Sequence, residues 1–146
     1  MTPDEVLESQ FGGPDTGIFT DGSCDPNPGP GGWGWVWVAN GEILDQGNGR
    51  DPDTTNNRME LMALIEAFKK LPSDQDLVAY SDSQLCVNTI NEWAVGWEKR
   101  GWKRKGGPIK NLDLVQQLYA LAHEKPRIEL RWIRAHDGSR WNEYAD

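Results

Sequence analysis

Apolar residues recur along the chain at helical spacing in three places. The clearest stripe, at Leu61, Leu64, Ile65, Phe68 and Leu71, predicts a helix over 59–71, and Pro72 follows as a stop signal. Similar stripes predict helices over 84–93 and 112–123. These segments should each bury one apolar face against a common core.

Short apolar runs and alternating patterns predict five strands, over 17–20, 33–39, 42–47, 76–80 and 127–134. Asn40-Gly41 is a strong hairpin signal between the second and third strands. Proline and glycine fill 25–32, so no regular structure is expected there. In the last strand, Ile128, Leu130 and Trp132 are expected to face the helices. The order of strands and helices predicts an α/β domain with a mixed sheet covered by helices.

The length of 146 residues suits one domain. Residues 1–15 look like a flexible leader and 16–146 like the folded domain, without a signal peptide. The longest apolar run, 33–39, is too short to span a membrane. Cys24 and Cys86 are too few for a disulfide framework, which favours a reducing cytoplasm. We expect a monomer.

Positive charge is concentrated in one segment of a chain whose net charge is −8. The window 98–110 holds six of the 15 lysines and arginines against one acid, and tryptophans are interleaved with it. This mixture suits a polyanion with surfaces that stack, although a solvated helix and loop with tryptophans in the core is the alternative. The residues concerned are Trp93, Trp97, Lys99, Arg100, Trp102, Lys103, Arg104, Lys105 and Lys110.

Four acids are candidates for one metal site: Asp21, Glu60, Asp82 and Asp146. If the strands that precede Asp21 and Asp82 are parallel neighbours, both carboxylates emerge at the same sheet edge. The first turn of the helix carrying Glu60 can lean over that edge. Converging carboxylates repel one another unless a cation lies between them, and hard divalent ions such as Mg²⁺ or Mn²⁺ prefer oxygen ligands.

Each acid also has an ordinary explanation. Asp21-Gly22 could be a turn, and Glu60 could close a capping box with Asn57. Asp82 could simply favour a helix N-terminus in a Ser81–Gln84 capping pattern, and Asp146 could be an unremarkable last residue. Taken together, these explanations would leave several carboxylates converging without a cation.

From about Thr16 onward the chain resembles the type 1 ribonuclease H family of bacteria. The segments that carry the resemblance are FTDGSCDPNPGPGG, TTNNRMELMA, YSDSQ, WEKRGWKRKGGPIKNLDL and AHDGSRWNEYAD. The resemblance implies a ribonuclease H-like fold, with a five-stranded mixed β-sheet flanked by α-helices. It also implies an endonuclease that hydrolyses the RNA strand of RNA–DNA hybrids.

The resemblance implies roles for individual residues. Asp21, Glu60, Asp82 and Asp146 match the metal-binding acids, and His136 matches a histidine that assists proton movement or product release. Two Mg²⁺ or Mn²⁺ ions would act on the attacking and leaving oxygens, giving 5′-phosphate and 3′-hydroxyl products. Matches to substrate-binding positions are Cys24, Asn27, Thr55, Asn56 and Gln84, and the segment 93–110 matches a basic protrusion that holds the DNA strand.

Members of the family continue past the last acid, whereas this sequence ends at Asp146, so its α-carboxylate is expected near the metal site. Three other classes remain open. A different nuclease or a transposase-like protein of the same fold would lack the basic, tryptophan-rich segment. A catalytically silent hybrid-binding module would have lost an acid, and a metal-binding domain that does not act on nucleic acid is the third alternative.

Overall fold

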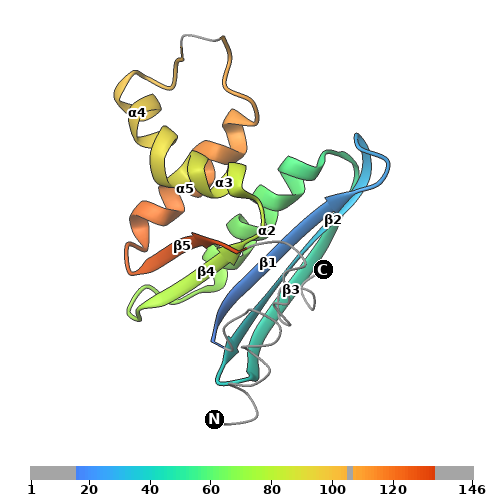
Figure 1. Ribbon diagram of the computed structural model, residues 1–146, viewed down its shortest axis with the longest axis vertical. Coiled ribbons are helices and arrows are strands. Elements are labelled where there is room, and N and C mark those ends of the chain that lie inside the picture. Colours follow the sequence, from blue (N-terminus) through green and yellow to red (C-terminus); the bar gives the residue numbers. More distant parts are fainter. Residues whose placement is uncertain (1–15, 105–106, 134–146) are drawn as a thin grey trace.

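The centre of the protein is a five-stranded mixed sheet in the order β3-β2-β1-β4-β5 (Figure 1). The computed structural model describes residues 16–104 and 107–133. β1, β2 and β3 pair in antiparallel fashion, whereas β4 pairs in parallel with both β1 and β5. The strands are β1 (Gly17–Cys24), β2 (Gly29–Ala39), β3 (Glu42–Thr54), β4 (Leu77–Ser81) and β5 (Ile128–Trp132). The predicted α/β class and mixed sheet are confirmed.

The first hairpin is longer than the sequence predicts. β2 begins at Gly29 instead of Trp33, and β3 continues to Thr54 instead of ending at Gly47. The expectation that 25–32 is irregular is therefore wrong for its second half.

Backbone pairing explains this extension. Gly31 pairs with Cys24 of β1 on one side and with Asp51 of β3 on the other, so the ladder continues through residues of low strand propensity. The register of β2 against β3 shifts between Gly29 and Gly31, which leaves Pro30 outside the pairing. A proline at such an irregularity costs no ladder hydrogen bond.

The helices follow the predicted order, with one extension. They are α2 (Asn56–Lys70), α3 (Gln84–Asn88), the π-helix η1 (Thr89–Trp93), α4 (Ala94–Lys99) and α5 (Leu112–Glu124). The helical segment after β4 therefore continues through α4, although the apolar stripe predicted its end at Trp93. Ala94 is completely buried, so core packing carries the helix past that point. α4 and the segment that follows it project away from the sheet (Figure 1).

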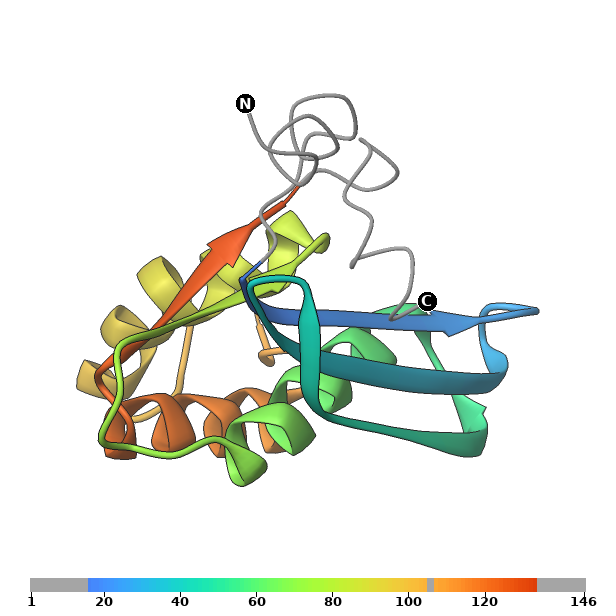
Figure 2. The same ribbon diagram turned by 90° about the horizontal axis from the view of Figure 1, so that it is seen from below.

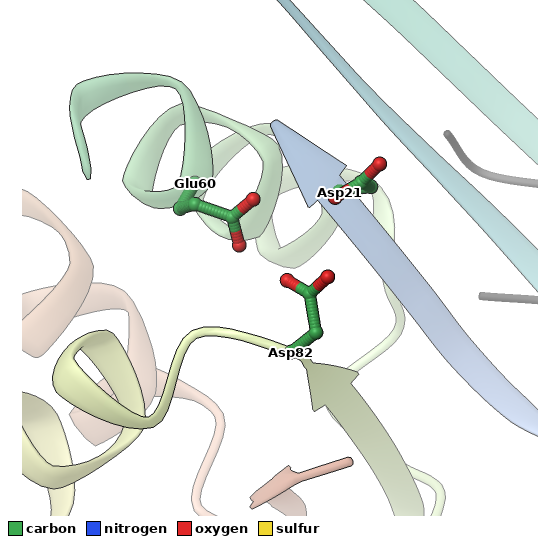
Figure 3. A group of neighbouring side chains, drawn as sticks. All are labelled: Asp21, Glu60 and Asp82. Atoms are coloured by element: carbon green, nitrogen blue, oxygen red, sulfur yellow. The ribbon is translucent and has the colours of Figure 1, made fainter. Parts of the chain in front are cut away.

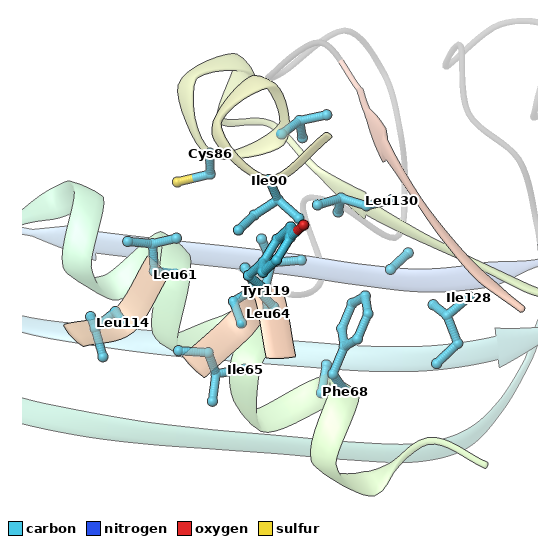
Figure 4. Close-up of a cluster of buried hydrophobic side chains, with 14 of the residues drawn as sticks. Leu61, Leu64, Ile65, Phe68, Cys86, Ile90, Leu114, Tyr119, Ile128 and Leu130 are labelled. Carbon is cyan, nitrogen blue, oxygen red and sulfur yellow. The ribbon is translucent and has the colours of Figure 1, made fainter. Parts of the chain in front are cut away.

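All the described helices pack into one apolar cluster on the same face of the sheet (Figures 2 and 4). Strand alternation separates this cluster from a smaller one: Ile18 of β1 belongs to the main core, whereas its neighbour Phe19 packs with Val36 and Val38 in the second. Within residues 16–104 and 107–133, none of the helices combines the length and the apolar character needed to cross a bilayer.

The expectation for Trp132 is wrong. Ile128 and Leu130 are each 6% exposed and belong to the core, whereas Trp132 is 42% exposed. By strand alternation it faces the same side as Ile128 and Leu130. It is, however, the last residue of β5, beyond the packed part of the sheet. Its indole instead reaches the loop that follows β4.

Candidate active site

Parallel pairing of β1 with β4 brings Asp21 and Asp82 to the same edge. The pairing ends at Thr20 opposite Ser81, and the next residue on each segment is one of the two acids. β1 itself continues to Cys24 by pairing with β2, so Asp21 lies where its parallel partner stops and not at the predicted end of its strand. Open α/β sheets bind their ligands at this kind of edge.

Glu60 reaches the same edge from the second turn of α2. Thr55 caps this helix, since its side chain accepts a hydrogen bond from Arg58 N. Glu60 is only 7% exposed, and its Oε1 accepts from Gly22 N at 2.7 Å. The capping-box alternative with Asn57 is therefore wrong, because the Glu60 carboxylate points toward β1.

Gly22 makes this contact possible by its lack of a side chain. A Cβ at this position would lie 2.3 Å from the carbonyl carbon of Met59 and 2.5 Å from Glu60 N, both backbone atoms. β1 and α2 can therefore approach closely enough for the Gly22 amide to reach the Glu60 carboxylate. Asp21 and Gly22 both lie within β1 and pair with β2, so the alternative that they form a turn is wrong.

Ser81 supports the site from the end of β4. It is completely buried, and its hydroxyl donates to Glu60 Oε2 at 3.3 Å while accepting from Ser83 N at 3.1 Å. Ser83, not Ser81, caps α3 by accepting from Cys86 N. The alternative of a Ser81–Gln84 capping pattern is therefore wrong, and nothing in the sequence marked Ser81 as a partner of Glu60.

The three described acids form one compact group. Asp21, Glu60 and Asp82 each offer a carboxylate oxygen, and these oxygens all lie within 4.8 Å of one another (Figure 3). Asp146 and His136, the other predicted catalytic residues, lie outside the described residues. A group of oxygen ligands at this spacing suits a hard divalent cation.

The electrostatics of the triad favour a cation. Burial, followed by the charge and hydrogen bonding of Asp82 and the charge of Asp21, raises the pKa of Glu60 to about 10, against a smaller opposing effect of the Gly22 amide. In the absence of a cation, Glu60 therefore holds a proton at neutral pH. A bound divalent ion would offset the effect of burial and of the neighbouring negative charge, and would favour the ionised form of Glu60.

Several predicted substrate-binding residues lie around the same edge. Asn56 N donates to Asn27 Oδ1 at 3.2 Å, so the two asparagines lie side by side, and both residues are exposed. Gln84 is exposed at the start of α3, two residues after Asp82. Thr55 is half-buried and its hydroxyl serves the helix cap.

Cys24 is placed differently from its polar neighbours. It is 7% exposed, and its Sγ lies 3.1 Å from both Pro26 O and Gly29 O and 3.4 Å from Thr54 O. The thiol therefore faces the backbone of the connection between β1 and β2. This geometry favours the alternative of a small buried residue that supports the loop.

The basic segment forms the projecting part of the molecule. Trp93 is 42% exposed, and its ring centroid lies 6.3 Å from that of the half-buried Trp97. Trp102 is half-buried and packs edge-on against Tyr119 of α5 at 5.5 Å, which ties the segment to the body. Lys105 lies outside the described residues. The exposed basic residues in the described part of the segment 93–110 are Lys99, Arg100, Lys103, Arg104 and Lys110.

A cleft of about 330 Å³ separates this projection from the body. Trp93, Trp97 and Arg104 line it from the projection, and Asn57 and Asn111 line it from the body. The sequence-based predictions did not single out these two asparagines as site residues. Asn111 adopts a left-handed backbone with φ of 56°, a conformation that asparagine tolerates and that the sequence did not mark.

A larger groove of about 530 Å³ begins at Asp21. It crosses the glycines of β2 toward Asn48 and Arg50 on β3. Asp21 is thus the member of the triad that faces a groove large enough for a ligand much larger than an ion.

The fold and the triad define an α/β protein whose candidate ligand site lies at the carboxyl edge of its parallel strands. The chain matches the RNase H family over residues 14–146. A ribonuclease H of Herminiimonas arsenicoxydans is 48% identical over 130 residues, which cover 88% of each chain. The chain belongs to the ribonuclease H family and is thus a nuclease.

Solved structures agree with this assignment. LC9-RNase H1, a type 1 RNase H with the type 2 active-site motif, is 34% identical with a TM-score of 0.72, covering 88% of this chain and 67% of that one. LC11-RNase H1, solved in complex with an RNA/DNA hybrid, is 26% identical with a TM-score of 0.65, covering 86% of this chain and 90% of that one.

Proposed function

We propose that this protein is an endonuclease that hydrolyses the RNA strand of RNA–DNA hybrids and leaves 5′-phosphate and 3′-hydroxyl ends. The observation that carries the proposal is the carboxylate triad of Asp21, Glu60 and Asp82 at the edge of the sheet, within 4.8 Å. Membership in the ribonuclease H family and the hybrid bound to LC11-RNase H1 support the choice of substrate.

The triad, with Asp146 as a fourth acid, would hold two Mg²⁺ ions, or Mn²⁺ in their place. The donor set fits, because all its members are carboxylates and Glu60 cannot ionise easily beside Asp82 without a cation. Bound there, such ions supply a nucleophilic water and charge stabilisation of the leaving oxygen in an in-line displacement. Mg²⁺ usually keeps several waters, so a few carboxylates suffice.

The protein's own groups prepare this site before the substrate arrives. Gly22 N of β1 donates to one oxygen of the Glu60 carboxylate, and the Ser81 hydroxyl of β4 donates to the other. A metal-ligating side chain whose orientation is fixed in this way loses less conformational entropy when the metal binds. His136 is proposed to assist proton movement or product release.

Discrimination between RNA and DNA requires a group that senses the 2′-hydroxyl, which both donates and accepts hydrogen bonds. The side-chain amides of Asn27, Asn56 and Gln84 can do both, and they are exposed near the triad. We assign the RNA strand to these residues. Thr55 is assigned to a DNA phosphate, and Cys24 to the support of the RNA-facing loop.

The basic projection, residues 93–110, is proposed to bind the DNA strand through phosphate and sugar. Contacts of its exposed cations to phosphate and sugar carry no sequence information, so binding should tolerate any sequence and weaken with salt. The catalytic domain would comprise residues 16–146, preceded by a leader over 1–15. Since Cys24 and Cys86 are free thiols, we place the enzyme in the cytoplasm. We also propose that it acts as a monomer.

A cleavage assay tests the proposal directly. Labelled RNA–DNA hybrid, double-stranded RNA and double-stranded DNA are incubated with Mg²⁺, with Mn²⁺ and with a chelator. We expect cleavage of the RNA strand of the hybrid alone, with either ion, and none with the chelator. Cleavage of double-stranded DNA, or activity that survives the chelator, would contradict the proposal.

Replacing one acid of the triad tests the proposed metal site. Asp21→Asn keeps the shape of the side chain but removes the charge that the ions require, so cleavage should fall at least about 1,000-fold while hybrid binding persists. Asp45→Asn, at an exposed acid of β3, is the matched control and should cleave normally. Substantial activity in Asp21→Asn would reject the metal assignment.

A further inference from the structure

The end of β5 is attached to the segment that carries Asp82 by two hydrogen bonds. Trp132 Nε1 donates to Asp82 O at 3.2 Å, and Ile133 N donates to Ser81 O at 2.9 Å. Both acceptors are backbone carbonyls at the point where β4 ends. The peptide groups on either side of Asp82 are thus held from the neighbouring strand.

Trp132 does little for the core, although it is the largest residue of β5. Its side chain is 42% exposed, whereas Ile128 and Leu130 of the same parity are each 6% exposed. A smaller or polar residue could therefore stand at this position without loss of core packing. Within residues 16–104 and 107–133, the polar contact that an indole adds at this position is the ring N–H that reaches the Asp82 carbonyl.

Fixing this carbonyl fixes the backbone of Asp82. The orientation of the peptide plane after a residue sets its ψ angle, which leaves the Asp82 side chain only its own two torsions for aiming the carboxylate. Ser83, the next residue, begins the cap of α3, so the Asp82 backbone lies between two restrained segments. Without the indole hydrogen bond, the carbonyl would be free to rotate toward water.

We propose that Trp132 is a positioning residue for the metal site: its indole N–H restrains Asp82 so that the carboxylate stays directed at Glu60 and Asp21. This inference rests on the proposed function, since it assumes that the triad holds divalent ions. Trp132 acts through the Asp82 backbone and contacts no ion itself. Partners that orient ligands from outside the coordination shell typically contribute about 10-fold or more to metal affinity.

The test compares two Trp→Phe variants in the full chain. Trp132→Phe removes the N–H and keeps an aromatic ring, and Trp37→Phe makes the same change at a half-buried position of β2. Titration calorimetry with Mn²⁺, in the absence of nucleic acid, measures the metal affinity of each. We expect a loss of about 10-fold in Trp132→Phe and none in Trp37→Phe. KM for the hybrid at saturating metal should stay within about two-fold in both.

Tryptophan fluorescence gives an independent reading. Because the indole of Trp132 is hydrogen-bonded to Asp82, saturating Mn²⁺ should change the emission of the wild type and of Trp37→Phe by a similar amount, and that of Trp132→Phe by clearly less. Wild-type metal affinity in Trp132→Phe overturns the proposal, as does an equal loss in both variants. A raised KM with unchanged metal affinity also overturns it, because Trp132 would then be a substrate contact.

These outcomes are separable from a failure of the proposed function. A wild-type protein that neither binds Mn²⁺ nor cleaves hybrid refutes the nuclease proposal. A wild type that does both, with Trp132→Phe indistinguishable from it, refutes only the positioning role.

Discussion

At the scale of single residues, Ser81 joins two parts of the site through one hydroxyl. It donates to Glu60 and accepts from the backbone of Ser83, so it connects α2 with the start of α3. The group is completely buried, and water does not replace a lost partner at such a position. Its hydrogen bonds therefore matter both to stability and to the aim of Glu60.

We expect Ser81→Ala to lower the free energy of unfolding by about 1–2 kcal/mol, because the half-buried Ser83 N–H and the buried Glu60 side chain each lose a partner. kcat at fixed metal should fall about 3–10-fold, and more metal should be needed for half-maximal rate. Ser81→Thr keeps the hydroxyl and serves as the matched variant, with most of both properties retained. Chemical denaturation and cleavage kinetics measure the two effects. Normal kinetics in Ser81→Ala would show that Gly22 alone orients Glu60.

At the scale of elements, the arrangement of Asp21 and Asp82 followed from the strand pattern. The run before each acid predicted a strand, and a right-handed crossover predicted that the two strands are parallel neighbours, which the pairing of β1 with β4 confirms. Helix α2 was equally clear from its apolar stripe. Local patterns thus sufficed wherever apolar periodicity and topology pointed to one answer.

Other elements depend on contacts that no local pattern encodes. The second half of β3 is polar and has no large apolar residue, and it is a strand because β2 offers its backbone as far as Gly29. Gly22 and Trp132 are site residues through a close approach and an indole bond between segments distant in sequence. Such interactions follow from the assembled fold, so the sequence indicated the acids of the candidate site better than the groups that hold them.

The basic projection is an element whose position is fixed by aromatic packing. Trp102 packs on Tyr119, which in turn lies 4.2 Å, centroid to centroid, from the ring of His123 in the next turn of α5. Exposed lysines and arginines are therefore presented from an anchored base. An anchored cluster of cations binds a polyanion at a lower entropic cost than a loose one.

Removing two of these cations should weaken substrate binding more than chemistry. In Lys103→Ala/Arg104→Ala, KM for the hybrid should rise about five-fold at moderate salt while kcat stays within about two-fold. The slope of log KM against log salt should become shallower by about two. Lys69→Ala/Lys70→Ala, which removes the same charge from the end of α2, should change neither quantity. Steady-state kinetics at several salt concentrations measure these effects. Equal effects of the two double substitutions would contradict the proposal that the projection binds the substrate.

At the scale of the whole molecule, charge is divided between two regions. The protein carries a net charge of −8, yet its projection is basic and its site gathers three acids. A polyanionic substrate is repelled by most of this surface and attracted by one part of it. With the proposed function, this charge pattern would orient the hybrid by repulsion as well as attraction, and dications held by the triad would offset the repulsion at the proposed cleavage site.

The same acids link the stability of the fold to pH and metal. Burial, then the charge of Asp82, raises the pKa of Glu60 from 4.5 to about 10, so the folded, metal-free protein binds a proton more tightly than the unfolded chain does. This contribution to stability is complete below about pH 4.5 and is lost as pH rises toward 10. Metal binding requires the ionised form, so the stabilisation by metal should grow over the same range.

We therefore expect Mg²⁺ at about ten times its dissociation constant to stabilise the fold at pH 8 by about 1.4 kcal/mol, or about 3–6 °C in Tm, and by much less at pH 5. Glu60→Gln mimics the protonated side chain, so without metal it should be at least as stable as the wild type at pH 8. It should also lose most of the Mg²⁺-induced shift. Thermal unfolding of both proteins at the two pH values, with Mg²⁺ and with a chelator, measures this. A wild-type Tm at pH 8 that does not change with Mg²⁺ would contradict the proposal that the triad binds this ion in the folded state.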